Sequence, residues 1–238
     1  MKTTTFSPFL IRGVQLAMVA AFLICSSTMS RPVEQNYGRL QEQDSEITDQ
    51  TASDDGICAT IDCIRNAMAN PDPGDEIIIK SGTYKVDDKI KGAFNRKVYL
   101  HSSKNGTSAE PIILRGERKA NPPVIEGLGY TDGYLLSLEG DFWIIRDIEF
   151  KTGSKGVVLD HSNHNKLINI TVHDIGEEGI HLRDGSSSNL VDGCKVYDTG
   201  KKKPGFGEGF YVGSDKGQHN TYERSCDNNT FQNCSIGP

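Results

Sequence analysis

Gly179-Ile180-His181-Leu182-Arg183 is one of three stretches that open with glycine and place apolar residues second and fourth; the others are Gly156-Val157-Val158-Leu159-Asp160 and Gly209-Phe210-Tyr211-Val212-Gly213. Between them runs a second repeat of apolar triplets, which start at positions 145, 167, 191 and 231 and so lie 22, 24 and 40 residues apart. A period in the low twenties, built from short strands and turns, predicts a parallel β-solenoid in which stacked coils form one continuous core.

The two ends of the chain are expected to differ from this repeat. Residues 1–30 are typical of a secretory signal, because an apolar run too short to span a bilayer follows two basic residues and precedes small ones. Residues 31–55 are polar and predict a disordered leader, so the solenoid is expected over 56–238. The sequence stops in the middle of a repeat, which predicts either a truncated chain or a last coil that another element covers.

The coils that precede the regular repeat are less uniform. An amphipathic segment at 58–68 predicts a short helix that caps the open end of the solenoid. Short strands bounded by Pro and Gly are then expected at 76–84, 97–101, 111–115, 124–126 and 134–138. The final step of 40 residues carries two insertions, 199–206 and 214–227, and insertions in solenoids map to loops that often form the binding face.

Cysteine and asparagine positions suggest structural roles. Without the signal, five of the six cysteines remain, so at least one thiol is free or pairs between chains. Cys194 and Cys234 occupy equivalent inward positions on neighbouring coils, which favours either a disulfide or two small buried side chains.

Asn105 and Asn228 stand in Asn-x-Thr sequons within expected loops and are predicted glycosylation acceptors. A hydrogen-bonded ladder at a bend is expected from Asp147, Asn169, Gly193 and Asn233.

Three segments carry a resemblance to a known group. Residues 72–84 look like the opening coil of the pectate-lyase-like β-helix proteins, and 105–116 resembles the next signature, found in alginate-lyase and chondroitinase relatives. Residues 207–213 are similar to coils of secreted members. The resemblance covers about residue 56 to the end and implies an all-β, right-handed, single-stranded parallel β-helix. It also implies a secreted carbohydrate-directed protein, most often a polysaccharide lyase, although these turn and core residues signal the fold rather than the chemistry.

Lyases of this superfamily cleave uronic-acid polymers by β-elimination. The reaction needs a positive group that neutralises the substrate carboxylate and a base for the adjacent proton. The resemblance implies that Ca²⁺ often supplies the positive group and that Lys or Arg often supplies the base. A net charge of −6 argues against nucleic acid as a partner, and the expected partner is an acidic polysaccharide.

Aligning the Gly-led strands places candidate residues on one outward face. Lys155, Glu178 and Glu208 stand just before the three glycines. Because neighbouring strands lie about 4.8 Å apart, Glu178 and Glu208 could share a Ca²⁺ ion with Glu177 or Asp215. The alternative is that these glutamates are ordinary turn residues on a polar face.

Further candidates follow from the same alignment. Arg183 is a candidate base or carboxylate clamp, and His181 a candidate for proton transfer because its ordinary pKa lies near neutrality. Substrate-binding candidates are Tyr211, Asp160 and the cationic loop residue Lys201.

Three functions stay open on the sequence alone. The first is a secreted enzyme that cleaves acidic polysaccharide, and the second a non-catalytic carbohydrate-binding or cell-wall protein on the same scaffold. The third is a secreted pathogen effector, because a signal, an acidic leader and a compact domain resemble the arrangement in oomycete effectors. Residues 37–41 lack the Arg-x-Leu-Arg motif of such leaders.

Overall fold

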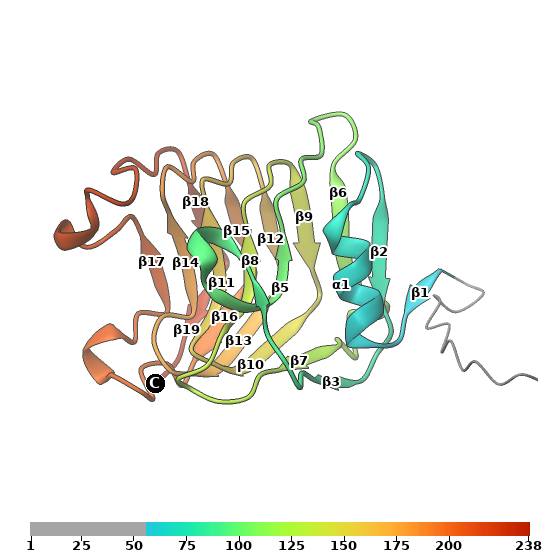
Figure 1. Ribbon diagram of the computed structural model, residues 1–238, viewed down its shortest axis with the longest axis horizontal. Helices are drawn as coiled ribbons and strands as arrows, with labels where there is room; N and C mark the ends of the chain where they lie inside the picture. Colours follow the sequence, from blue (N-terminus) through green and yellow to red (C-terminus); the bar gives the residue numbers. More distant parts are fainter. Residues whose placement is uncertain (1–55) are drawn as a thin grey trace, which may run out of the picture. The chain divides into compact units, whose positions relative to one another are not determined.

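A computed structural model describes residues 56–238, which form a parallel β-helix (Figure 1). The predicted signal segment, 1–30, and the predicted leader, 31–55, lie outside the described residues. The chain turns repeatedly through three short strands per coil, and the strands of successive coils stack into three parallel sheets. The predicted all-β solenoid is therefore confirmed.

Each sheet takes one strand from most coils. The first sheet runs β1 (Ile57–Cys58), β2 (Glu76–Ile79), β6 (Ile112–Gly116), β9 (Trp143–Arg146), β12 (Lys166–Ile168), β15 (Leu190–Asp192) and β18 (Thr230–Gln232). The second sheet runs β3 (Thr83–Lys85), β7 (Val124–Glu126), β10 (Glu149–Gly153), β13 (Thr171–Ile175), β16 (Lys195–Tyr197) and β19 (Ser235–Ile236). The third sheet runs β4 (Ile90–Lys91), β5 (Lys97–Ser102), β8 (Tyr134–Leu138), β11 (Lys155–Asp160), β14 (Ile180–Arg183) and β17 (Phe210–Val212).

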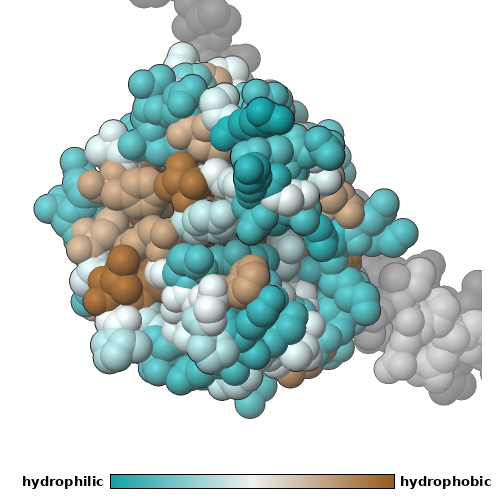
Figure 2. Space-filling model, turned by 90° about the vertical axis from the view of Figure 1, so that its left-hand side faces the viewer, coloured by the Kyte–Doolittle hydropathy of each residue, from teal (hydrophilic) through white to brown (hydrophobic). Residues whose placement is uncertain are grey.

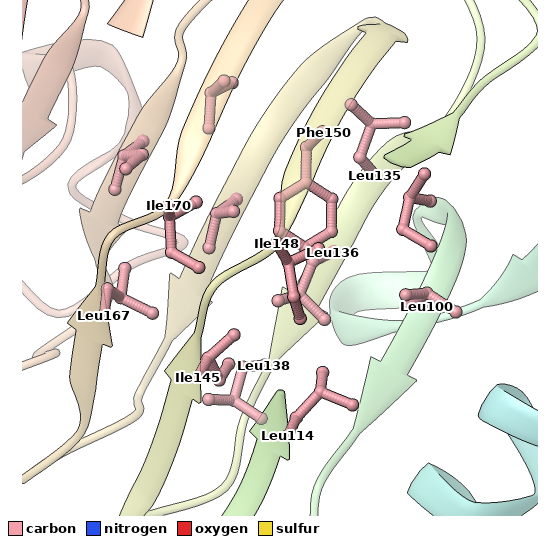
Figure 3. Packing of buried hydrophobic residues seen from close by; sticks show 14 of the residues in the cluster. Leu100, Leu114, Leu135, Leu136, Leu138, Ile145, Ile148, Phe150, Leu167 and Ile170 are labelled. Atoms are coloured by element: carbon pink, nitrogen blue, oxygen red, sulfur yellow. The ribbon is translucent and has the colours of Figure 1, made fainter. Parts of the chain in front are cut away.

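The repeat seen in the sequence sets the register between coils. Leu167 pairs with Ile145 on one side and with Val191 on the other, and Val191 pairs with Phe231. Figure 3 shows Ile145 and Leu167 of the first sheet, Phe150 of the second and Leu136 of the third meeting inside the coils. Burying a Leu, Ile or Val side chain stabilises the fold by about 1.5–3 kcal/mol, so each added coil extends a core that no coil could form alone.

The bends between sheets need backbone conformations that Asn, Asp and Gly tolerate. The φ angles of Asp147, Asn169, Gly193 and Asn233 are 59°, 52°, 65° and 54°, all left-handed. The Asn169 amide donates to Asp147 Oδ1 at 3.2 Å, so the predicted ladder exists, although Gly193 interrupts it.

A second ladder, which the sequence analysis missed, lies at another bend. The backbone N–H of Asn165 donates to Asn189 Oδ1 at 2.8 Å, and the N–H of Asn189 donates to Asn229 Oδ1 at 2.9 Å. These stacked amides satisfy the backbone where the chain leaves one sheet for the next.

The N-terminal end of the β-helix is covered by α1 (Ile61–Ala69), as predicted (Figure 1). The Thr60 side chain caps this helix by accepting from the Cys63 N–H at 3.2 Å, and Ile64 and Met68 are fully buried. No helix among residues 56–238 has the length and apolar character needed to cross a membrane.

The disulfide differs from the predicted one. Cys58 bonds to Cys63 and so fastens β1 to α1. Cys194 and Cys234 are both free thiols, so the predicted Cys194–Cys234 disulfide is wrong. Each thiol instead lies against a backbone carbonyl, 3.4 Å from Leu167 O and 3.5 Å from Val191 O respectively.

The last coil leaves its strands without an outer partner among the described residues. Within the described residues, β17, β18 and β19 are the terminal strands of their sheets. Viewed from this end, the surface shows hydrophobic residues gathered on one side (Figure 2). Phe206, Val212 and Ile236 are exposed in this part of the chain.

Candidate functional site

A cavity of about 560 Å³ lies on the outer face of the third sheet. Its floor comes from β8, β11, β14 and β17, and two loops flank it: 198–209 before β17 and 213–229 after it. In Figure 1 these loops project on either side of β17, in orange and red. Both predicted insertions therefore line the cavity, because the extra residues of the 40-residue step leave the coil on this face.

Alternation along β14 aims its polar side chains at this cavity. Ile180 and Leu182 are buried in the core, while His181 and Arg183 line the cavity. His181 pairs in register with Tyr211 of β17, and Arg183 with Asp160 of β11. The predicted outward stacking is confirmed.

Arg183 is held by a buried ion pair. Its Nε and Nη2 donate to the two carboxylate oxygens of Asp160 at 2.5 and 3.1 Å, and both side chains are almost fully buried. Burial alone would lower the pKa of Arg183, but the hydrogen bonds and charge of Asp160 raise it above its ordinary value. The ion pair with Asp160 and the raised pKa argue against the predicted role of Arg183 as a base, because the guanidinium stays charged. Asp160 is likewise committed to Arg183 rather than free for substrate.

His181 is buried and neutral. Its Nε2 donates to Gly213 O at 2.8 Å, and its ring packs against Tyr211 with centroids 4.5 Å apart. Burial lowers the pKa of His181 to about 3, although the hydrogen bond to Gly213 opposes the change. The imidazole was predicted to transfer protons because of a pKa near neutrality, and the structure removes that reason. Its visible contacts anchor the start of the 213–229 loop.

Lys155 was placed beside the candidate glutamates by the strand alignment, but nothing in the sequence was a reason to assign it a role. It begins β11, and its ammonium contacts Glu178 Oε2 and lies 3.1 Å from Glu177 Oε2. Burial lowers the pKa of Lys155 to about 8, against the opposing effect of the Glu177 carboxylate. The signal was its place directly before Gly156, equivalent to that of Glu178 before Gly179.

The carboxylates here do not fit the predicted Ca²⁺ site. Glu178 is buried against Lys155, whereas Glu208 is exposed on the 198–209 loop. Within residues 56–238, no three His, Cys, Asp or Glu side chains are grouped so as to hold a metal ion. A cation shared by Glu178 and Glu208 would meet the Lys155 ammonium, which already contacts Glu178.

Two cations at the cavity lack an acidic partner within the described part of the chain. Arg96 donates through Nη2 to the Tyr222 hydroxyl at 3.1 Å, and Lys203 lies over the Phe206 ring at 3.6 Å. Neither forms an ion pair with a carboxylate of residues 56–238. They can therefore receive anionic groups of a ligand.

Three of the remaining predicted residues lie elsewhere. Lys201 does not line the cavity and pairs with Asp198 at 2.7 Å. Asn105 and Asn228 are exposed, as glycosylation would require, and their modification stays a prediction.

The chain is similar in sequence to known β-helix proteins. The family described as Pel9A-like, right-handed β-helix region matches residues 46–235. Pectate lyase L of Dickeya chrysanthemi is 28% identical over 166 residues, which cover 66% of this chain and 37% of that protein.

Solved structures agree with this match. An alginate lyase from Paenibacillus sp. str. FPU-7 superposes with a TM-score of 0.70 at 38% identity, covering 77% of this chain and 58% of that one. Pectate lyase Pel9A, with a TM-score of 0.57 at 24% identity, shares the fold. The chain spans less than two thirds of each relative's length. It belongs to the Pel9A-like, right-handed β-helix family, within the pectate-lyase-like superfamily.

Proposed function

We propose that this protein is a polysaccharide lyase that cleaves a uronate-containing polymer by β-elimination. One observation carries the proposal: a buried lysine, Lys155, whose pKa is lowered to about 8, faces a cavity beside Arg183. Similarity to proteins named pectate lyase and alginate lyase supports the same class of substrate. Secretion, predicted from residues 1–30, would bring the protein to such a polymer.

Lys155 suits the base role better than His181 does. A general base works best when the pKa of its conjugate acid lies near the working pH. The pKa of Lys155 is lowered to about 8, so a large fraction is neutral amine in mildly alkaline solution. The pKa of His181 is lowered to about 3, which makes its imidazole too weak to remove a proton next to a carboxylate.

The proposed step balances without a co-reactant. The neutral Lys155 amine takes the proton from the carbon next to the substrate carboxylate, and the bond to the leaving glycosidic oxygen breaks as the double bond forms. The Lys155 ammonium then returns that proton to the leaving oxygen. Its close contacts with Glu177 and Glu178 hold the amino group in place throughout.

The substrate carboxylate must be neutralised for its neighbouring proton to become acidic. Arg96 and Lys203 face the cavity and have no carboxylate partner among residues 56–238, so they are the candidate clamps. Arg183 acts differently: it is enclosed by Asp160 and two tyrosine rings. Its fixed positive charge helps lower the pKa of Lys155.

The test is the appearance of unsaturated uronate, which absorbs near 230 nm. Purified protein is incubated with polygalacturonate, alginate and chondroitin, each in separate reactions. A steady rise with at least one polymer supports the proposal. A flat absorbance from folded protein that still binds one of these polymers would favour the non-catalytic carbohydrate-binding alternative.

A further inference from the structure

A turn from the early coils reaches over the outer face of the third sheet. β4 pairs antiparallel with β5, through Ile90 with Val98, and the turn between them is closed by the Arg96 N–H donating to Ala93 O at 3.0 Å. Within this turn Phe94 and Asn95 have φ angles of 54° and 58°. Two consecutive non-glycine residues in the left-handed region mark a conformation that the local sequence does not favour. The turn thereby presents Phe94 and Arg96 to the cavity side of the sheet.

The 213–229 loop meets this turn from the opposite end of the sheet. Tyr222 lies in that loop, yet only 5% of it is exposed. Its hydroxyl accepts from Arg96 Nη2 at 3.1 Å across 126 residues of sequence, and its ring meets Phe94 edge-on with centroids 5.0 Å apart. The same ring covers the Arg183 guanidinium, with Cζ 4.7 Å from the ring centroid. We call the contact among Phe94, Arg96, Tyr222 and Arg183 the clasp.

The clasp bounds the cavity on the side of the early coils. In the third sheet the strands follow the order β4, β5, β8, β11, β14, β17, so Arg96 comes from one end of the sheet and Tyr222 from the other. Arg96 directly precedes β5, and both Arg96 and Tyr222 line the cavity, so a polymer that continued past Lys155 toward β5 would meet the contact between Arg96 and Tyr222. The Arg96 Nη2 and the Tyr222 hydroxyl are 3.1 Å apart, and the Phe94 ring packs against the Tyr222 ring, so no sugar ring fits between these side chains.

We infer that the clasp makes the enzyme exo-acting, so that it binds a chain end in the cavity and releases short unsaturated products. This inference rests on the proposed lyase function. Arg96 stands at the closed end with no carboxylate partner among the described residues, so it binds the carboxylate of the terminal sugar unit. Tyr222 acts as the wall and orients the Arg96 guanidinium through its hydroxyl.

The first test follows absorbance near 230 nm and specific viscosity together on a long polymer. The wild-type protein is expected to raise the absorbance while the viscosity falls slowly, with one short product class from the first minutes. A rapid loss of viscosity with oligomers of mixed length would overturn the inference and leave the lyase function standing. Absence of any unsaturated product would refute the lyase function itself, and the exo inference with it.

Variants of the clasp provide the second test. Tyr222→Ala removes the wall and is expected to increase the viscosity lost per bond cleaved, whereas Tyr222→Phe keeps the ring and is expected to retain the wild-type ratio. The Phe94 ring supports Tyr222 from the other side, so Phe94→Ala serves as a second variant that opens the wall. Phe94 is 45% exposed, so this truncation is expected to leave the protein folded. If both alanine variants melt like the wild type and keep the wild-type ratio, the clasp does not end the groove.

Arg96 gives a separate kinetic readout. Arg96→Gln is expected to raise KM about tenfold, because the bound substrate loses a hydrogen bond between its terminal carboxylate and a charged group. Arg96→Lys should recover part of that affinity. An unchanged KM in Arg96→Gln would remove Arg96 from the terminal subsite.

Discussion

The pH dependence of catalysis should report the ionisation of Lys155. The base must be neutral to accept a proton, so activity rises as pH increases through its pKa. Burial lowers the pKa of Lys155 from 10.5 to about 8, which raises the neutral fraction at pH 8 from about 0.3% to about one half. One unit lower, at pH 7, only about a tenth of the lysine is neutral, so the rate should fall about fivefold.

The assay is kcat/KM between pH 6 and 10, from initial rates of absorbance near 230 nm. The expected profile rises with a slope of one up to about pH 8 and then levels. Glu177 raises the pKa of Lys155, so Glu177→Gln should move the rising limb to lower pH. A profile that is flat over this range, or that rises only near the ordinary lysine value of 10.5, would refute Lys155 as the buried base. A limb that does not move in Glu177→Gln would contradict the electrostatic argument.

Three further predictions concern stability and metal dependence. Asp160→Asn leaves the buried Arg183 charge without its partner, so the free energy of unfolding should fall by about 3–5 kcal/mol in urea titrations. A loss below about 1 kcal/mol would contradict the burial of the pair. Asn189→Ala orphans a backbone N–H in the asparagine ladder and should cost about 1–3 kcal/mol in the same measurement, and an unchanged midpoint would mean that water replaces the amide. A chelator should leave the initial rate unchanged, because the Lys155 ammonium contacts Glu178 where a cation was expected. Activity that is lost with the chelator and restored by Ca²⁺ would contradict this prediction.

The fold was predictable because its determinants are local and repeated. Apolar residues at equivalent places of each coil, such as Ile145, Leu167 and Val191, must face inward for any coil to bury its surface, and they pair in register in the structure. Asn and Asp at the bends adopt left-handed φ angles, which few other residues tolerate. The outward position of His181 and Arg183 follows from strand alternation alone.

The chemistry of the site was less predictable, because it depends on burial and on contacts between distant segments. Sequence spacing predicted that Glu178 and Glu208 lie side by side. In the structure the buried ammonium of Lys155 forms an ion pair with Glu178, while Glu208 is exposed. His181 loses its proton-transfer role through burial, which no spacing rule reports. The contact between Arg96 and Tyr222 joins residues 126 positions apart, so only the folded chain reveals it.

The most direct test of the account compares two lysine variants on the polymer that the wild-type protein cleaves. Lys155→Met replaces the proposed base with a side chain of similar length, and Lys195→Met makes the same change on the exposed face of the second sheet. Loss of one general base typically lowers the rate by about 10²- to 10⁴-fold, so Lys155→Met should lose nearly all production of unsaturated uronate while Lys195→Met keeps the wild-type rate. A folded Lys155→Met protein that still releases unsaturated uronate at the wild-type rate would contradict the central claim.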